Sequence, residues 1–492
     1  MKRVLVCALA MLLALTACVQ QEPVAAATTS EPAAAATEEP TPEPTAEPAV
    51  EAPYIDARKP YTYIWENERD RKWEEDIVFF ADTYLDPYRG HPLLSDRITN
   101  VCLYTDPVMR YSSEGKSNFF DPELKERFIE RINELILSIP EKTDFELAFG
   151  IYEAAAMMHD AHTRCFSSLI DDEDVLPLIA VPVETESGTC AVIEYAPESV
   201  KEILGTQLIA INEVPLSEVV ERMRPLISSE NEYAVESEFY SDLNPSQILR
   251  YVGVLDNGNT VPITVRDRAG DEKRYEIDLW PMEDFARENL AHYTSGIGNE
   301  DGDMGICLRD RNSSSDVWYK MLMDGEALYL RLNTCAVDES AGQIFEEAFS
   351  TAKESGKCKK ILVDFRQNDG GYADLSGNFL TLANGLQTAD AKVYVLIDGG
   401  SFSSAIMIPA MLRRRTENVR LIGTPGGQPV RFFEGSSFVL KNSGIYCRCS
   451  TGLLDAWPGY EGDALMPDVT VYQTLEDFCE GYDSVLKYIL EQ

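Results

Sequence analysis

Short apolar runs alternate with helical segments between residues 300 and 490, and this alternation restricts the architectures open to the chain. We expect buried strands at residues 327–332, 361–365, 393–397 and 419–422, and a last strand at 469–472. Helices are expected at about 340–353 and 403–414. Strands and helices in alternation predict an α/β layer.

The charge of the chain excludes one class of partner. The 492 residues include 43 Lys and Arg against 83 Asp and Glu, which gives a net charge of −40. Proteins that bind nucleic acid carry a basic surface, so no nucleic acid is expected as a partner. Anionic membrane surfaces would also repel this chain, so any membrane attachment must come from something other than charge.

The N-terminus has the features of an export signal. Met1-Lys2-Arg3 is basic, and the apolar run at 4–15 fits a signal-peptide core but is too short to span a membrane. The run ends in Leu15-Thr16-Ala17-Cys18, which resembles the lipobox of bacterial lipoproteins. The resemblance implies that residues 1–17 are removed and that Cys18 is lipidated. An ordinary secretory signal that contains a cysteine is the alternative.

A linker is expected at residues 18–54. Residues 19–53 hold seven Glu, seven Pro and neither Lys nor Arg. Such a segment cannot bury a core and is expected to stay extended. It fits a tether between a lipid anchor and a folded part, which predicts an extracytoplasmic bacterial membrane lipoprotein held to the membrane only by its anchor.

Residues 55–177 are predicted to be mainly helical. One helix is expected to begin at Asp121-Pro122, with a capping side chain followed by proline, and to end at Pro140. A second is expected from about Thr143 to His159.

Residues 178–285 have the pattern of a β-rich module. A hairpin is predicted around Ala269-Gly270-Asp271, and a helix at 216–223. The stretch from Gly205 to Pro215 resembles the strand-turn-strand of PDZ domains, which bind extended peptide termini. No clear carboxylate-binding loop precedes it, so we interpret this region as a PDZ-like module.

Three loops of the chain could carry chemistry. Ser403 lies in Ser401-Phe402-Ser403-Ser404-Ala405, at a strand-to-helix turn where backbone N–H groups meet its hydroxyl. Gly370 and Gly371 follow another buried strand, where the backbone can approach a ligand closely. Glu461 lies in a loop before the last strand. Each loop also has a purely structural interpretation: Ser403 could cap a helix, the two glycines could form a plain turn, and Glu461 could be a solvated surface acid.

The order of the motifs is more specific than any one of them. The order along the chain is Asp160-Ala161-His162-Thr163, the PDZ-like module, Asn368-Asp369-Gly370-Gly371, the serine turn, Ile422-Gly423-Thr424-Pro425-Gly426-Gly427 and Tyr460-Glu461-Gly462. This order resembles the serine peptidases of the C-terminal processing (tail-specific) and tricorn-core family, which includes the interphotoreceptor retinoid-binding proteins. The resemblance implies a crotonase-like core of the spiral ββα kind at residues 286–492.

The family has two catalytic designs. One pairs the serine with a lysine further along the chain, but Gln428 stands at that place and no lysine lies between Lys392 and Lys441. The other design is Ser-His-Glu. The resemblance then implies Ser403 as nucleophile, His162 as base and Glu461 as the acid that orients the imidazole.

The resemblance also implies an oxyanion hole from the N–H groups of Ser404 and of Gly370 or Gly371. Ser404 is the alternative nucleophile if the turn is aligned one residue out. Ala161 stands where tricorn-type members carry a serine, so a fourth polar member is missing.

No cofactor and no metal are expected. His159 and His162 lie three residues apart, but no third ligand is evident. The spacing of the eleven cysteines suggests no regular disulfide framework, and Cys447 and Cys449, on a probable strand, are expected to be core or surface thiols.

The sequence therefore predicts a serine endopeptidase that hydrolyses extracytoplasmic proteins or peptides through an acyl-enzyme on Ser403. A catalytically inactive lipoprotein of the same fold, which binds peptides or apolar ligands, is the alternative.

Overall fold

The structure is a computed structural model. It describes residues 67–85, 122–167, 174–185, 188–287, 290–293, 299, 301–338, 340–371 and 377–492. The predicted signal peptide, the lipidation site Cys18 and the linker at 18–54 lie outside these residues.

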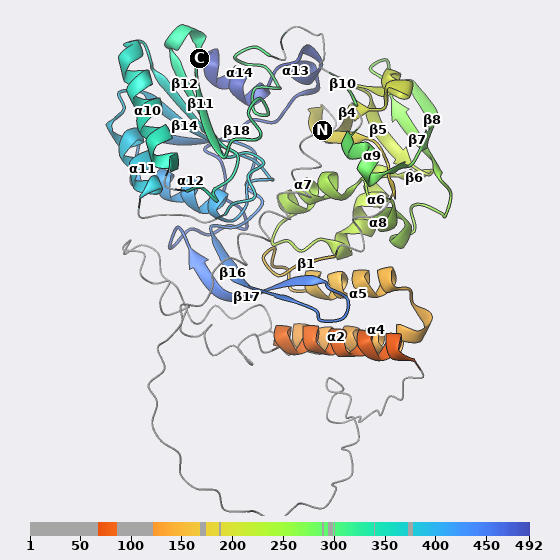
Figure 1. Ribbon diagram of the computed structural model, residues 1–492. Helices are drawn as coiled ribbons and strands as arrows, with labels where there is room; N and C mark the ends of the chain where they lie inside the picture. The colour runs from red at the N-terminus through yellow and green to blue at the C-terminus, as the bar shows by residue number, and fades with distance from the viewer. Residues whose placement is uncertain are drawn as a thin grey trace, which may run out of the picture.

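A six-stranded sheet forms the C-terminal part of the molecule (Figure 1). Its strands, in spatial order, are β11 (Val317–Leu322), β12 (Ala327–Leu332), β13 (Lys360–Asp364), β14 (Lys392–Ile397), β15 (Val419–Gly423) and β18 (Val469–Thr470). β11 is antiparallel to β12, and all other neighbours are parallel. Parallel neighbours need crossover connections, which for the first three pairs contain α10 (Ser340–Ser355), α11 (Asn378–Thr388) and α12 (Ser404–Arg415). Residues 424–468 connect β15 to β18. The α/β prediction is confirmed.

Both faces of this sheet are buried because successive strand residues point to opposite sides. Leu328 and Leu330 of β12 pack in a core with α10, α11 and α12. Tyr329, between them, faces the other side and packs against the C-terminal helix α14 (Ser484–Leu490). The carboxyl ends of β13 and β14 therefore meet at one edge of a rigid layer.

A second, antiparallel sheet lies beside the first (Figure 1). Its main path is β10 (Ala291–His292), β4 (Gly188–Ala196), β5 (Gln207–Ile211), β7 (Thr260–Arg266) and β8 (Glu272–Asp278), with β3 (Ile179–Thr185) on β4 and β6 (Val214–Pro215) on β5. The helices of this region are α6 (Leu216–Met223), α7 (Glu232–Asp242), α8 (Ser246–Tyr251) and α9 (Met282–Arg287). A small pair, β2 (Asp174–Val175) with β9 (Trp280–Pro281), borders it.

The N-terminal helices pack under a long hairpin of the C-terminal part (Figure 1). These are α2 (Glu68–Leu85), α4 (Pro122–Leu137) and α5 (Asp144–Ala156), and the hairpin is β16 (Arg431–Val439) with β17 (Tyr446–Asp455). β1 (Cys165–Phe166), directly after the histidine motif, pairs with β17. Cys447 and Cys449 of β17 are buried in this core, as expected for core thiols. The hairpin thus joins parts of the chain that are far apart in sequence.

The remaining elements are short. Helix α13 (Leu475–Glu480) precedes α14, and 3-10 turns cover Ile139–Glu141, Glu198–Ile203, Arg224–Leu226 and Met323–Gly325. Within the described ranges, every helix is too short or too polar to cross a membrane.

Most predicted elements are present, with small shifts at their ends. Helix α6 and strand β12 have the predicted bounds, whereas α5 ends at Ala156 instead of continuing to His159. His159 has φ +48°, a left-handed conformation that ends the helix and turns the chain into the histidine motif. Helix α11, strand β11 and the β16–β17 pairing were not predicted.

Candidate active site

The turn between β14 and α12 holds Ser403 in a strained conformation. Its φ of +54° and ψ of −118° lie outside the regions that residues with a side chain ordinarily occupy, at a cost of about 1–3 kcal/mol. The turn is held by backbone hydrogen bonds: Phe402 N–H donates to Asn368 O at 3.0 Å, and Gly427 N–H donates to Ser401 O at 3.2 Å. Sharp, strained strand-to-helix turns of this kind present nucleophilic serines in hydrolases.

The histidine motif is fixed by its own aspartate. One oxygen of Asp160, Oδ1, accepts a hydrogen bond from His162 N–H at 3.0 Å, and Oδ2 accepts one from Thr163 Oγ1 at 2.6 Å. The imidazole of His162 lies between the rings of Phe402 and Phe432, at centroid distances of 4.4 and 5.5 Å. This side chain is only 1% exposed. Its ring therefore has little freedom to turn.

The structure brings Ser403 and His162 together. His162 Nε2 lies 3.0 Å from Ser403 Oγ, although 241 positions separate the two residues in sequence. Burial lowers the pKa of His162 well below its ordinary value, and the cations Arg448 and Arg164 lower it further. The imidazole is therefore neutral near pH 7, as a general base must be.

The expectation for Glu461 is wrong. Glu461 is exposed, whereas the second ring nitrogen of His162, Nδ1, lies 3.1 Å from Nε2 of Gln428. The neighbouring Tyr460 explains this placement: its ring packs against the core, and its hydroxyl donates to Ala464 O at 3.1 Å and accepts from Met466 N–H at 2.9 Å. With Tyr460 anchored inward, Glu461 is left at the surface.

Gln428 and Glu230 occupy the place that Glu461 was expected to take. Gln428 is fully buried, and its Nε2 donates to Glu230 Oε1 at 3.0 Å. The other oxygen of Glu230 accepts from Ala161 N–H at 3.2 Å. Burial and the neighbouring carboxylate of Asp160 raise the pKa of Glu230 to about 8. A carboxyl group so perturbed beside a Ser-His pair is a candidate for a functional position.

Sequence reasoning missed Glu230 altogether. It directly precedes Asn231, the capping residue of α7, and an acid at the start of a helix is commonplace. Gln428 was noticed only as a position without lysine. Neither residue carries a sequence signal for a role beside His162, because their positions depend on how the two sheets pack.

Of the three backbone N–H groups expected as oxyanion donors, the structure leaves two as candidates. Gly370 N–H donates to Asn368 Oδ1 at 2.9 Å, so it is occupied. The N–H groups of Gly371 and Ser404 have no acceptor among the described residues. Ser404 Oγ donates to Gly371 O at 2.7 Å, which places these two residues side by side and turns the Ser404 hydroxyl away from His162. The geometry thus favours Ser403 over Ser404 as nucleophile.

The chain shares its fold with mature CPAF. The structure of mature CPAF complexed with lactacystin matches with a TM-score of 0.51 and 12% identity, over 84% of this chain and 98% of that chain. A second structure of mature CPAF matches with a TM-score of 0.50, also at 12% identity, over 84% of this chain and 97% of the other. At this identity the likeness establishes the fold alone.

A further structural match is weaker. The photosystem II D1 C-terminal processing protease matches with a TM-score of 0.34 and 11% identity, over 86% of this chain and 97% of that chain. No protein-family model and no curated protein sequence matches this chain.

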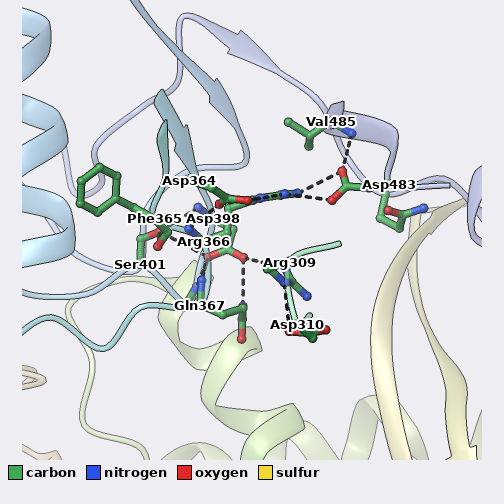
Figure 2. A network of polar contacts seen from close by, with 12 residues as sticks. Arg309, Asp310, Asp364, Phe365, Arg366, Gln367, Asp398, Ser401, Asp483 and Val485 are labelled. Atoms are coloured by element: carbon green, nitrogen blue, oxygen red, sulfur yellow. Dashed lines mark hydrogen bonds and ion pairs between the residues drawn. The ribbon is translucent and has the colours of Figure 1, made fainter. Parts of the chain in front are cut away.

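A buried ionic network braces the strand ends beneath the serine turn (Figure 2). Arg366 donates to Asp364 at 2.7 Å and contacts Asp483, the capping residue of α14, at 2.9 Å. Beside it, Ser401 Oγ donates to Phe365 O at 3.0 Å. The network ties the end of β13 to the start of the serine turn and to α14, so the loop that follows β13 and the serine turn share a rigid base.

Asp160, His162 and Glu230 are the one group of possible metal ligands found among the described residues, with ligand atoms within 4.8 Å of one another. His159 is exposed and does not belong to this group. Both ring nitrogens of His162 face protein partners, Ser403 and Gln428. The donor set is thus already engaged in hydrogen bonds within the site.

Proposed function

We propose that this chain is a serine peptidase that cleaves proteins or peptides through an acyl-enzyme on Ser403. The observation that carries the proposal is the 3.0 Å contact between Ser403 Oγ and His162 Nε2. It is supported by the strained turn that presents the serine and by the nearby N–H groups of Gly371 and Ser404, which have no acceptor in the part of the chain that the structure describes.

Each residue then has a defined task. Ser403 Oγ attacks the scissile carbonyl while a His162 Nε2 lone pair takes the hydroxyl proton, and the imidazolium returns that proton to the leaving amine. The oxyanion of the tetrahedral intermediate is stabilised by N–H groups of Gly371 and Ser404. Gln428 and Glu230 position His162.

The family and setting belong to the same proposal. We propose membership of the C-terminal processing and tricorn-core peptidases, with a crotonase-like core at 286–492 and a PDZ-like module at 178–285. The antiparallel sheet with the β7–β8 hairpin supports the module. Lipidation at Cys18 would place the enzyme outside the cytoplasm, and Cys18→Ala should then release it from membranes into the soluble fraction.

A fluorophosphonate probe and a denatured protein substrate test the activity. Wild type should be labelled and should cleave the substrate, and Ser403→Ala or His162→Ala should lower the rate by roughly 10⁴-fold or more. Ser350→Ala, on the exposed side of α10, is the matched control and should behave as wild type. If neither labelling nor cleavage occurs in wild type or in any variant of the residues that contact His162, the binding lipoprotein becomes the better explanation.

A further inference from the structure

The carboxamide of Gln428 contacts three groups of the active site at once. Its Oε1 accepts from Ser403 N–H at 2.9 Å. Its Nε2 lies 3.0 Å from Glu230 Oε1 and 3.1 Å from His162 Nδ1. The side chain is fully buried, so no solvent competes for these contacts.

These partners fix which way the amide points. The backbone N–H of Ser403 can only donate, so the Gln428 atom that faces it must be the oxygen. The NH₂ group then faces Glu230 Oε1, an oxygen with lone pairs that can accept a hydrogen bond in either protonation state of the carboxyl group, and it also faces His162. An amide NH₂ carries two hydrogens and accepts none. One hydrogen goes to Glu230 and the other to Nδ1.

An Nδ1 that accepts a hydrogen bond has no proton of its own. The neutral imidazole carries one proton, which must then be on Nε2, and His162 donates to Ser403 Oγ instead of accepting from it. A serine hydrolase needs the opposite arrangement, in which a partner accepts from Nδ1–H and leaves a lone pair on Nε2.

We propose that Gln428 is a positioning residue that holds His162 in the Nε2–H tautomer, so that the resting Ser403–His162 pair is latent. Glu230 is the acceptor that receives Nδ1–H when Gln428 turns away, since its carboxylate lies within 4.8 Å of a His162 ring nitrogen. Activation moves one proton from Nε2 to Nδ1 and leaves the charge of the site unchanged. This inference rests on the proposed peptidase function.

Exchanging the two side chains provides the test. In the double variant Glu230→Gln with Gln428→Glu, a carboxylate at 428 can accept from Ser403 N–H and from Nδ1–H. The new amide at 230 can accept from Ala161 N–H and donate to that carboxylate. Composition and net charge do not change, and every contact is satisfied. In the single variant Glu230→Gln, two amide NH₂ groups would face each other, so the second substitution should rescue the first.

The position of the proton is read directly by nitrogen-15 NMR of full-length protein with labelled histidine, with His162 assigned by its loss in His162→Gln. Wild type should show an unprotonated Nδ1 and a protonated Nε2, and the exchange variant should show the reverse. Fluorophosphonate labelling should be at least about tenfold faster in the exchange variant, because a positioned general base is worth about 10²–10⁴-fold. Gln343→Glu, exposed on α10, should change neither readout.

The outcomes separate this inference from the proposed function. A protonated Nδ1 in wild type, or an unchanged tautomer after the exchange, overturns the inference. A reversed tautomer without faster labelling overturns the claim of latency. If the tautomers behave as expected and no variant reacts with the probe, Gln428 keeps its assigned role and the peptidase proposal fails.

Discussion

Gly370 lies so close to Ser403, the proposed nucleophile, that a single methyl group added at this glycine should disable the proposed active site. A Cβ added there would lie 2.6 Å from Ser403 Cβ and 2.8 Å from Phe402 O, about 0.8 and 0.6 Å short of an ordinary contact of 3.4 Å. Ser403 would have to move by a similar distance. Since a displacement of about 1 Å can cost about 10²-fold in rate, we expect Gly370→Ala to lower fluorophosphonate labelling by about 10²-fold.

The same substitution also strains the backbone, and a matched glycine separates the two effects. Gly370 has φ +89°, and Gly270, in the β7–β8 hairpin, has φ +91° with no atom within 4 Å of an added Cβ. Both alanine variants should lose about 1–3 kcal/mol of unfolding free energy, measured by urea denaturation. Only Gly370→Ala should lose labelling. Equal labelling of the two variants would refute the steric argument.

Three further predictions concern stability. Arg366→Met should cost about 3–5 kcal/mol in urea denaturation, because it removes the cation that bridges the buried carboxylates of Asp364 and Asp483, although Arg331 still lies 3.5 Å from Asp364; a loss below about 1 kcal/mol would contradict this. Burial alone would raise the pKa of Asp364, but Arg366 and Arg331 outweigh it and hold that pKa below its ordinary value. The stabilisation that the ionised Asp364 contributes is therefore complete above its unfolded pKa of about 3.9 and is lost as pH falls through its folded pKa. The unfolding free energy should fall below about pH 4, and it should fall less steeply in Arg366→Met. Thr143→Ala removes the capping box of α5 and should cost about 1 kcal/mol, with no change in labelling.

Part of the active site follows from local chemistry that the sequence displays. The strand ending at Ile397 is visible as an apolar run and the helix starting at Ser404 follows a serine-rich segment, so the turn at Ser403 is predictable. His162 is predictable only through the order of the motifs. Glu461 was assigned in the same way, and there the resemblance fails, because the inward packing of Tyr460 decides where its neighbour points.

The sequence by itself determined the α/β alternation and the serine turn, since each depends on periodicity or turn chemistry within a few residues. The pairing of Ser403 with His162, 241 positions apart, was predicted only through the resemblance in motif order. Only the tertiary structure decided which residues lie on the Nδ1 side of the His162 imidazole. Gln428 follows β15, Glu230 precedes α7, and His162 follows α5; hydrogen bonds between them exist only after three separate parts of the chain pack together. Which atom of His162 carries the proton is settled by that packing, because a hydrogen bond of about 3 Å is sensitive to placement that no local pattern encodes.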